Sequence, residues 1–548
     1  MMDLFPAKAQ FRSGEEVVLH LETGGRPWKA ALITVFLLDR VVLQKTVPAW
    51  PGNVRVSLGS FDTEFAGYGV KAVVSTDTGS LVLTTAFDVT DDPRRSLRYG
   101  FLSDFTEQDE DNGAIEWLCK CHINMVQYYD WSYRHDQLTA PQEHYRDMMG
   151  KSISKRTVKN KIRRGQERGM LAMAYGAVYA ASRSFFELHR NWAFYNSQQE
   201  PFVFIDTFYL MNIQRGSPWR EHLIGQYRKA MESMGFDGIH MDTYGFPKTA
   251  YSHLNGQPEL VRLDREFPSL IEQARQELTA FDKSPYLIFN NVGNWPVYAT
   301  AAATQDAVYI EVWSPFERYA YIAQLIREAK MLAGEGKPVI LAAYLKPFQD
   351  EERERAMAAA CILTAAIVSN GAYHLLTGEN KGVLTQGYYS DYTRLTDENA
   401  AVLRRYYDFL IRYINLFYDP ALQNVSMTHM GWDNYEYQCL SHPVSVWGEA
   451  GKLWLILREK PERKCLFSVN LCGCGDDFWN KGKPMPAPKR DVCWQVQVDR
   501  PVKKICTASP EAPEARELPF HYTDSDMGCF VRFCIPEVAV WNVVWIEF

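Results

Sequence analysis

The chain has 548 residues, which is too long for one hydrophobic core and predicts two to four domains. A net charge of -7 excludes the basic surface that nucleic-acid binding requires and gives no attraction to anionic membranes. No apolar run approaches the roughly 20 residues of a transmembrane helix. We therefore expect a soluble multidomain protein without nucleic-acid or membrane partners.

The N-terminus and the cysteines bear on location and cofactors. Residues 1–12 lack the basic-then-apolar pattern of a signal peptide, so we expect a cytoplasmic location, or secretion if a leader has been removed. The 11 cysteines are odd in number and scattered, which favours reduced thiols over a disulfide framework. The pairs Cys119/Cys121 and Cys472/Cys474 lack the spacing of a zinc site. No metal or other cofactor is expected.

The first part of the chain alternates apolar and polar residues at the period of a β-strand. Glu16–Leu21, Ala31–Leu37 and Val70–Ser75 show the alternation, and Gly24 and Gly25 supply a turn between two such runs. Short alternating strands separated by turns are typical of antiparallel sandwiches. The pattern predicts an immunoglobulin-like β-sandwich over residues 1–95.

From Arg98 to about Phe417 strands alternate with amphipathic helices, which predicts a parallel sheet. Eight such units fit a central (β/α)8 TIM barrel over residues 96–418. The strands are expected at Tyr99–Asp104, Ile123–Tyr129, Met170–Gly176, Gly238–Asp242, Tyr286–Asn291, Ala307–Val312, Pro338–Tyr344 and Ala372–Thr377. Helices are expected at Pro218–Met234, Pro258–Phe281, Phe316–Ala333 and Glu351–Ser369, among others.

Two further features complete the predicted organisation. The long stretch 179–220 after the third strand contains Phe202–Asp206 and predicts a loop with a hairpin over the barrel mouth. Beyond about Tyr418 the alternation returns, for example in Leu453–Leu457 and Cys529–Cys534. This pattern predicts a C-terminal antiparallel β-sandwich over residues 419–548.

The ends of the predicted strands carry the chemistry. In a (β/α)8 barrel the functional groups lie at the C-terminal ends of the strands. Two of these ends carry a carboxylate, Asp242 and Glu311, and a pair of carboxylates is the usual means of cleaving a glycosidic bond. Hydrogen-bonding groups suit sugar hydroxyls, and aromatic rings suit the apolar faces of a sugar. Other strand ends contribute Asp104, Tyr129, Asp130, His135, Tyr175, Asn290, Asn291, Trp313 and Tyr344.

Each of these residues also has a structural alternative. Asp242 can cap a helix that follows the strand, since aspartate is a common N-cap. Asp104 and Asp130 can orient a neighbour or cap a helix, and His135 can be an ordinary surface histidine. The aromatic content of 14% fits a sugar-binding site and an aromatic β-sandwich core equally well.

Four segments resemble the dextranase and cycloisomaltooligosaccharide glucanotransferase family, glycoside hydrolase family 66. They are Phe101–Phe105, His122–Trp131 with Arg134 and His135, Gly235–Thr243, and Tyr309–Trp313. The resemblance covers the barrel and the order of the domains, whereas the β domains carry no specific motif.

The resemblance implies a retaining hydrolase that cleaves α-1,6-linked dextran or isomaltooligosaccharides internally through a covalent glucosyl-enzyme. Asp242 is then the nucleophile, and Glu311 is the acid/base, about 5–5.5 Å away. Glu311 must start protonated, and an aromatic setting such as Trp313 is expected to raise its pKa. The resemblance further implies that the substrate is held by Asp104, Tyr129, Asp130, His135, Tyr175, Asn291, Trp313 and Tyr344.

Two departures from the family pattern matter. Cyclising members carry an inserted carbohydrate-binding module in the later half of the barrel, but only short loops separate Glu311 from Thr377 here, which favours hydrolysis over transglycosylation or cyclisation. Well-known dextranases are secreted, whereas a cytoplasmic enzyme meets imported oligosaccharides rather than the polymer. A non-catalytic glucan-binding protein is a third possibility, and the presence of both Asp242 and Glu311 argues against it.

Overall fold

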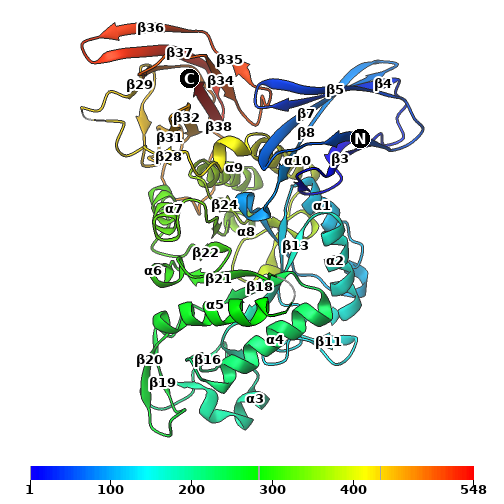
Figure 1. Ribbon diagram of the computed structural model, residues 1–548, viewed down its shortest axis with the longest axis vertical. Coiled ribbons are helices and arrows are strands. Elements are labelled where there is room, and N and C mark those ends of the chain that lie inside the picture. The colour runs from blue at the N-terminus through cyan, green and yellow to red at the C-terminus, as the bar shows by residue number, and fades with distance from the viewer. Residues whose placement is uncertain (1, 282–283, 432) are drawn as a thin grey trace.

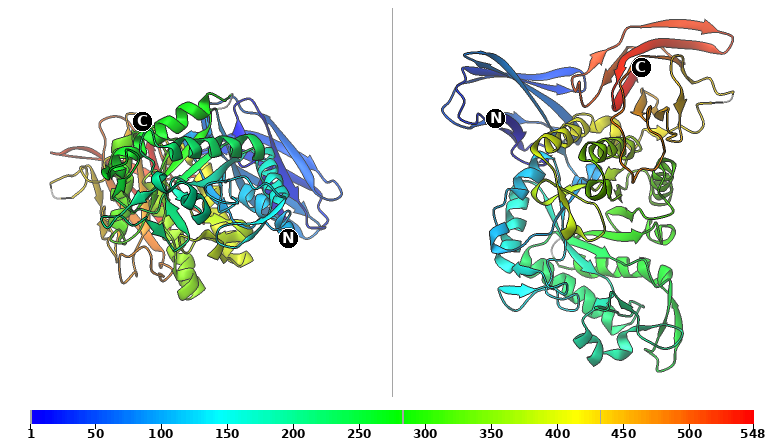
Figure 2. Two further views of the ribbon diagram at one scale, coloured as in Figure 1. Left: turned by 90° about the horizontal axis from the view of Figure 1, so that it is seen from below. Right: turned by 180° about the vertical axis from the view of Figure 1, so that it is seen from behind.

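The structure is a computed structural model that describes residues 2–281, 284–431 and 433–548. The molecule is elongated, and its N-terminal and C-terminal sheets lie together at one end (Figure 1). The opposite end carries helix α3 (Arg183–Leu188) and the hairpin of β19 (Thr249–Ser252) and β20 (Glu259–Arg262), as both long views show (Figure 2). A central curled sheet with its helices lies between these two ends.

Two sheets form the N-terminal part. One has the order β1 (Asp3–Pro6), β3 (Glu16–Glu22) and β6 (Val54–Ser60). The other has the order β2 (Phe11–Arg12), β8 (Gly79–Thr90), β7 (Phe65–Thr76), β4 (Ala30–Leu37) and β5 (Arg40–Pro48). The apolar positions of the predicted alternation, such as Val17, Ile33 and Val70, are fully buried in one shared cluster. The period-two pattern therefore reflects sheets with one face in a core.

All eight strand positions predicted for the barrel lie in the central sheet, in chain order and in parallel pairs. They are β9 (Tyr99–Leu102), β10 (Met125–Tyr128), β13 (Leu171–Ala177), β18 (Gly238–Asp242), β21 (Tyr286–Val292), β22 (Ala307–Glu311), β23 (Val339–Ala342) and β24 (Tyr373–His374). The predicted eighth strand is divided into β24 and β25 (Thr377–Gly378). Because β24 pairs with β23 and β25 pairs with β9, the sheet curls back to its first strand.

Helices follow the strands of the central sheet. The longer ones are α1 (Ala114–Lys120), α2 (Lys155–Glu167), α4 (Pro218–Met234), α5 (Leu263–Thr279), α7 (Tyr319–Ala333), α9 (Arg353–Ser369) and α10 (Asp397–Arg412). The prediction of a helix from Pro258 is wrong at its start, because Glu259–Arg262 pairs with β19 as strand β20. Among the described helices, none is long and apolar enough to cross a membrane.

The predicted hairpin after the third strand is confirmed. Strands β16 (Val203–Phe204) and β17 (Phe208–Leu210) form it, and β17 also pairs with β14 (Ala180–Ala181). Ile205 and Asp206 turn the chain with positive φ angles of 43° and 56°. The hairpin thereby presents the apolar side chain of Ile205 at its tip, where half of it is exposed.

Two sheets, antiparallel apart from the β30–β31 pair, form the C-terminal part and enclose a separate apolar cluster. One contains β28 (Gln423–Asn424), β30 (Val444–Ser445), β31 (Leu453–Lys460), β32 (Arg463–Asn470), β38 (Trp541–Glu547), β34 (Lys504–Ala508) and β35 (Arg516–Glu517). The other has the order β29 (Tyr437–Cys439), β33 (Lys489–Gln497), β37 (Gly528–Val538) and β36 (Phe520–Ser525).

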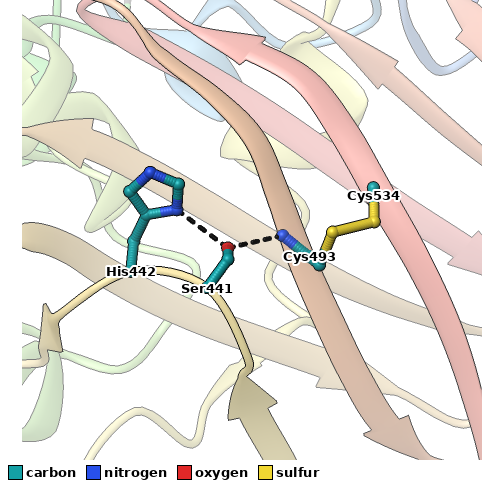
Figure 3. The surroundings of a disulfide bond; sticks show 4 residues. All are labelled: Ser441, His442, Cys493 and Cys534. Carbon is teal, nitrogen blue, oxygen red and sulfur yellow. Dashed lines mark hydrogen bonds between the residues drawn. A yellow bond between two sulfur atoms is a disulfide. The ribbon is translucent and has the colours of Figure 1, made fainter.

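A disulfide joins Cys493 of β33 to Cys534 of β37 (Figure 3). The expectation that all cysteines are reduced is therefore wrong for this pair. The two residues are direct cross-strand partners, with their Cα atoms 4.0 Å apart. A separation of 41 residues along the chain concealed this proximity. The other nine cysteines are free.

A buried ion pair fastens the N-terminal sheets to the central sheet. The Arg98 guanidinium donates to both carboxylate oxygens of Asp88, at 2.8 and 2.9 Å. Neither side chain is exposed. Arg98 also donates to the carbonyl oxygens of Ala9 and His122, so one side chain links strand β8, the N-terminal segment and the central fold.

Candidate active site

A cavity of about 470 Å³ opens where the parallel strands of the central sheet end. Seven residues singled out from the sequence line it: Tyr129, Asp130, His135, Tyr175, Asp242, Glu311 and Trp313. Two larger cavities, of about 590 and 660 Å³, lie elsewhere, and no strand of the central sheet lines either of them. The cavity of about 470 Å³ is the candidate active site because carboxyl groups and aromatic rings line it at the strand ends.

Asp242 is the last residue of β18 and is 9% exposed. Its Oδ2 accepts a hydrogen bond from the Tyr175 hydroxyl, and its Oδ1 accepts one from the Asn290 amide, both at 2.7 Å. The N-caps of α4 and α5 are Ser217 and Arg262, so Asp242 caps neither of these helices. Asp242 is instead a carboxyl group held toward the cavity by two side chains from neighbouring strands.

Glu311 is the last residue of β22. The Tyr344 hydroxyl donates to its Oε1 at 2.6 Å, and the Trp313 indole Nε1–H donates to its Oε2 at 3.1 Å. Trp313 is 41% exposed and packs against Tyr344, with ring centroids 5.4 Å apart. Tyr344 and Trp313 therefore hold Glu311, while Asn290 donates to Asp242 and also acts on Glu311.

Three tyrosines continue the hydrogen bonding behind Glu311. The Tyr344 hydroxyl lies 3.3 Å from the Tyr389 hydroxyl, which lies 2.5 Å from the Tyr309 hydroxyl. Tyr389 also stacks on Tyr129 of the cavity wall, with centroids 4.5 Å apart and rings inclined by 18°. Tyr389 thus contacts both Tyr344, which donates to Glu311, and Tyr129, which lines the cavity.

Burial raises the pKa of both carboxyl groups. It raises the pKa of Asp242 most, the neighbouring Glu311 raises it further to about 7, and the donors Asn290, Tyr175 and the Thr243 backbone N–H act in the opposite direction. Burial likewise raises the pKa of Glu311, against the hydrogen bonds from Tyr344, Trp313 and Asn290. The raised pKa of Glu311 agrees with the expectation, but Trp313 lowers it, contrary to what was expected. Because the two groups interact, they lose their protons in two steps and hold a single proton between those steps.

Asp130 and His135 also line the cavity and are mainly uncharged at neutral pH. Burial, together with Asp147 and Asp242, raises the pKa of Asp130 to about 8. Burial lowers the pKa of His135 to about 4. His135 is 5% exposed and therefore is not a surface histidine, and its Nδ1 has no hydrogen-bond partner in the described part of the chain. Both are neutral polar groups suited to hydroxyls.

Three residues proposed to hold substrate do not line the cavity. Asp104 accepts a hydrogen bond from Tyr392 at 2.7 Å and lies 3.8 Å from the Lys151 ammonium. Asn291 is fully buried, and its Oδ1 accepts from Thr300 at 2.6 Å. Tyr344 reaches the site through its bond to Glu311.

Asn291 was expected to hold substrate, but its neighbour Asn290 is the residue that contacts Asp242. Strand parity distinguishes the two. His240 pairs with Ile288, so Asp242 and Asn290, each two residues further along, share one face of the sheet. Asn291 has the opposite parity and faces the helices. The alternation of side chains along a strand, counted from the register with Asp242, therefore identifies Asn290 as its partner.

Further lining residues come from the predicted hairpin, from loops and from the end of β21. The hairpin contributes Phe204, Ile205 and Phe208, and the segment after β26 (Gly382–Val383) contributes Gly387 and Tyr388. Met149, Thr243, Tyr244 and Val292 complete the lining. Among the described residues, no group of histidines, cysteines or carboxylates is arranged to hold a metal ion.

Comparison with known proteins identifies the family. The model of glycosyl hydrolase family 66 matches residues 6–545. A cycloisomaltooligosaccharide glucanotransferase of Niallia circulans is 27% identical over 375 residues, which is 62% of this chain and 38% of that protein. A dextranase of Streptococcus salivarius is 23% identical over 394 residues, 60% of this chain and 46% of that protein. The chain thus spans less than half the length of the curated relatives it matches.

A solved structure extends the likeness to the whole fold. The crystal structure of a Paenibacillus cycloisomaltooligosaccharide glucanotransferase, in complex with cycloisomaltoheptaose, superposes with a TM-score of 0.89 at 20% identity. The superposition covers 100% of both chains. The family suggested by the four sequence motifs is confirmed: the chain belongs to glycosyl hydrolase family 66.

Proposed function

We propose that this protein is a retaining glycoside hydrolase that cleaves α-1,6-glucosidic linkages within dextran or isomaltooligosaccharides. One observation carries the proposal: Asp242 and Glu311 end two strands of one parallel sheet and line the same aromatic cavity. Two carboxyl groups on a sugar site are the equipment of glycosidases. Relatives named as a dextranase and as cycloisomaltooligosaccharide glucanotransferases support the α-1,6-glucan substrate.

In the proposed reaction Asp242 attacks the anomeric carbon while Glu311 gives its proton to the leaving glycosidic oxygen. The C–O bond to the leaving sugar breaks as the bond to the Asp242 carboxylate forms. Glu311 then removes a proton from water, and the resulting hydroxide displaces Asp242 and restores both groups. Direct attack by Asp242 requires the two carboxyl groups to lie about 5–5.5 Å apart.

Hydrogen bonds stabilise the ionised form of both carboxyl groups. Asp242 accepts from Tyr175, Asn290 and the Thr243 backbone, and Glu311 accepts from Tyr344 and Trp313, with a further contribution from Asn290. Because the donors are similar in number and length, the division of roles rests on the positions that the family resemblance assigns to Asp242 and Glu311.

Transglycosylation or cyclisation of the same substrates is the second candidate. The overall likeness to a glucanotransferase of known structure favours it. The short loops between Glu311 and Thr377 favour hydrolysis. Both reactions share the glucosyl-enzyme, and they differ in whether water or a sugar hydroxyl attacks it. A glucan-binding protein without activity is disfavoured because both carboxyl groups are present and hydrogen-bonded.

We further propose a layout of three domains for this enzyme. An immunoglobulin-like sandwich covers residues 1–95, a (β/α)8 barrel covers 96–418 and a C-terminal β-sandwich covers 419–548. The curled parallel sheet and the separate apolar clusters of the N-terminal and C-terminal parts support this division. Barrel enzymes place their sites at the C-terminal ends of the strands, where the cavity lies.

The test incubates the protein with dextran, isomaltooligosaccharides, pullulan and starch and separates the products by chromatography. Shorter isomaltooligosaccharides are expected from dextran, and NMR of the first products is expected to show the α-anomer. Asp242→Asn and Glu311→Gln should each abolish cleavage while glucan binding survives. Full activity in either variant overturns the assignment, and cyclic products would establish the second candidate.

A further inference from the structure

A loop of the C-terminal part contacts the two loops that carry the donors to Glu311. This 472–483 loop connects β32 to β33. One of its contacts is the segment after β22, which contains Trp313. The other is the segment after β23, which contains Tyr344 and continues through α8 (Pro347–Asp350) into α9. The loop therefore lies against both segments that complete the acid side of the cavity.

Trp479 makes the central contact with the first segment. Its indole Nε1–H donates to the Phe316 carbonyl at 2.6 Å, and its backbone N–H donates to the Glu317 carbonyl at 3.0 Å. Next to it, the Tyr319 backbone N–H donates to the Asp477 carbonyl at 2.9 Å. The chain from Phe316 to Tyr319 is thus bonded to the 472–483 loop along its length.

Gly482 makes the contact with the second segment. Its N–H donates to Glu351 Oε1 at 2.8 Å, and its carbonyl accepts from the Arg355 guanidinium at 2.9 Å. A Cβ at this position would lie 2.3 Å from the Glu351 carboxylate, so glycine allows the close approach. Glu351 lies between α8 and α9, and Arg355 lies in the first turn of α9, seven and eleven residues beyond Tyr344.

The loop is itself fixed. Trp479 is 3% exposed and belongs to the main apolar cluster of the molecule. Lys483 is 1% exposed and forms an ion pair with Asp476. Asp476 also accepts from the Phe478 N–H at 3.0 Å. The buried side chain of Trp479 and the ion pair between Lys483 and Asp476 therefore hold the loop in place.

The route from Trp479 to Glu311 is short. Phe316, whose carbonyl Trp479 holds, donates its own N–H to the Trp313 carbonyl at 2.9 Å. Trp313 in turn donates its indole N–H to Glu311. Trp313 packs against Tyr344 on one side but is 41% exposed, so the hydrogen bond to its backbone carbonyl is a second restraint on its orientation.

We propose that Trp479 is a positioning residue for the acid/base carboxyl group, acting through Phe316 and Trp313. The C-terminal β part then takes part in catalysis by fixing the direction of the indole N–H toward Glu311. This inference rests on the role of Glu311 under the proposed function. It assigns to the C-terminal part a task that its lack of sugar-binding motifs did not suggest.

The experiment compares Trp479→Phe with Trp541→Phe. The Trp541 indole also joins the C-terminal part to a barrel helix, donating to Ser369 Oγ at 2.9 Å, but at the end of α9, away from the donors of Glu311. Each substitution removes one indole N–H and part of a buried ring from a contact between the same two parts. The melting temperature of each variant measures the loss of stability, and only Trp479→Phe is expected to disturb the acid.

Three readouts separate positioning from simple stabilisation. For Trp479→Phe, kcat on an isomaltooligosaccharide should fall about 10-fold with KM little changed, within the roughly 10²-fold that a 1 Å misplacement costs. The alkaline limb of the pH profile should move up by about half a unit, because a weaker bond to ionised Glu311 raises its pKa. On a nitrophenyl glycoside, whose departure needs no acid, kcat/KM should stay within about 2-fold of the parent.

Trp541→Phe should keep the parent pH profile and kcat on both substrates. The proposal is overturned if the two variants lose thermal stability alike and neither alters kcat or the alkaline limb. Should Trp479→Phe fail to fold, Arg318→Ala removes the exposed ion pair of Arg318 with Asp477 and must show the same shifts in weaker form. An active Glu311→Gln variant would instead refute the proposed function.

Discussion

Replacing Tyr344 with phenylalanine isolates the electrostatic support of the acid. The substitution removes the hydroxyl that donates to Glu311 Oε1 at 2.6 Å and keeps the ring that packs against Trp313. Loss of a donor to the ionised form raises the pKa of a carboxyl group. The pKa of Glu311 should therefore rise in this variant.

The size of the rise follows from the bonds that remain. A hydrogen bond to a charged group contributes about 1.5–3 kcal/mol. Because one pKa unit corresponds to about 1.4 kcal/mol, the upper bound is about one to two units. Trp313 still donates at 3.1 Å, and the cavity admits water to the freed oxygen. A rise of about one unit is expected.

The assay is the pH dependence of kcat/KM for an isomaltooligosaccharide. Glu311 must be protonated to act as the acid, so a higher pKa keeps the enzyme active to higher pH and moves the alkaline limb up. Tyr175→Phe is the matched variant, because it removes the 2.7 Å donor to Asp242. Asp242 must be ionised, so its higher pKa should move the acidic limb up instead.

The two variants together give a decisive outcome. If Tyr344→Phe moves the acidic limb and Tyr175→Phe moves the alkaline limb, the roles of the two carboxyl groups are reversed. If neither limb moves, these hydrogen bonds do not control the ionisation of the pair, and the reasoning fails.

Three further outcomes are expected. Asn290→Ala should lower kcat/KM about 10- to 100-fold at little cost in melting temperature, because Asn290 contacts Asp242. Asn291→Ala should instead lower the melting temperature and leave kcat unchanged, because Asn291 bonds to Thr300 and not to Asp242. Asp130→Asn should bind a substrate analogue with the same affinity on both sides of pH 8, whereas the parent should lose affinity as its neutral acid ionises above that pH. Replacing Cys493 and Cys534 with serine should lower the free energy of unfolding by up to about 4 kcal/mol, measured in denaturant, and leave kcat unchanged, since the bond closes a loop of about 41 residues far from the cavity.

The parts of the fold that were predictable are those that one short segment encodes. Gly238–Asp242 is a buried strand that ends in a carboxylate, and its bounds in the structure are the predicted ones. Glu311 is recognisable for the same reason. In both segments, hydrophobic burial and the position of the acid lie within a few adjacent residues.

Other features depend on contacts between distant segments. Tyr389 supports Tyr344 from 45 positions away, and Phe204 reaches the cavity from a hairpin whose packing no periodicity describes. The disulfide follows from the register of β33 on β37, which is set by turns and by the opposite sheet. Asn290 is an intermediate case. Once the register of its strand with β18 is known, the alternation of side chains along the strand places Asn290 on the same face as Asp242.

The buried pair of Arg98 and Asp88 has a consequence for any shortened form of this enzyme. A cut in the linker after β8 removes Asp88 and the Ala9 carbonyl together, so the Arg98 guanidinium loses both its anion and the segment that covers it. Removing the anion alone, as in Asp88→Ala, leaves the guanidinium buried and unpaired and costs about 3–5 kcal/mol, a large part of the stability of a typical domain. The N-terminal sheets therefore supply a counter-ion to the central fold, and a shortened chain exposes a cation that the whole chain keeps buried.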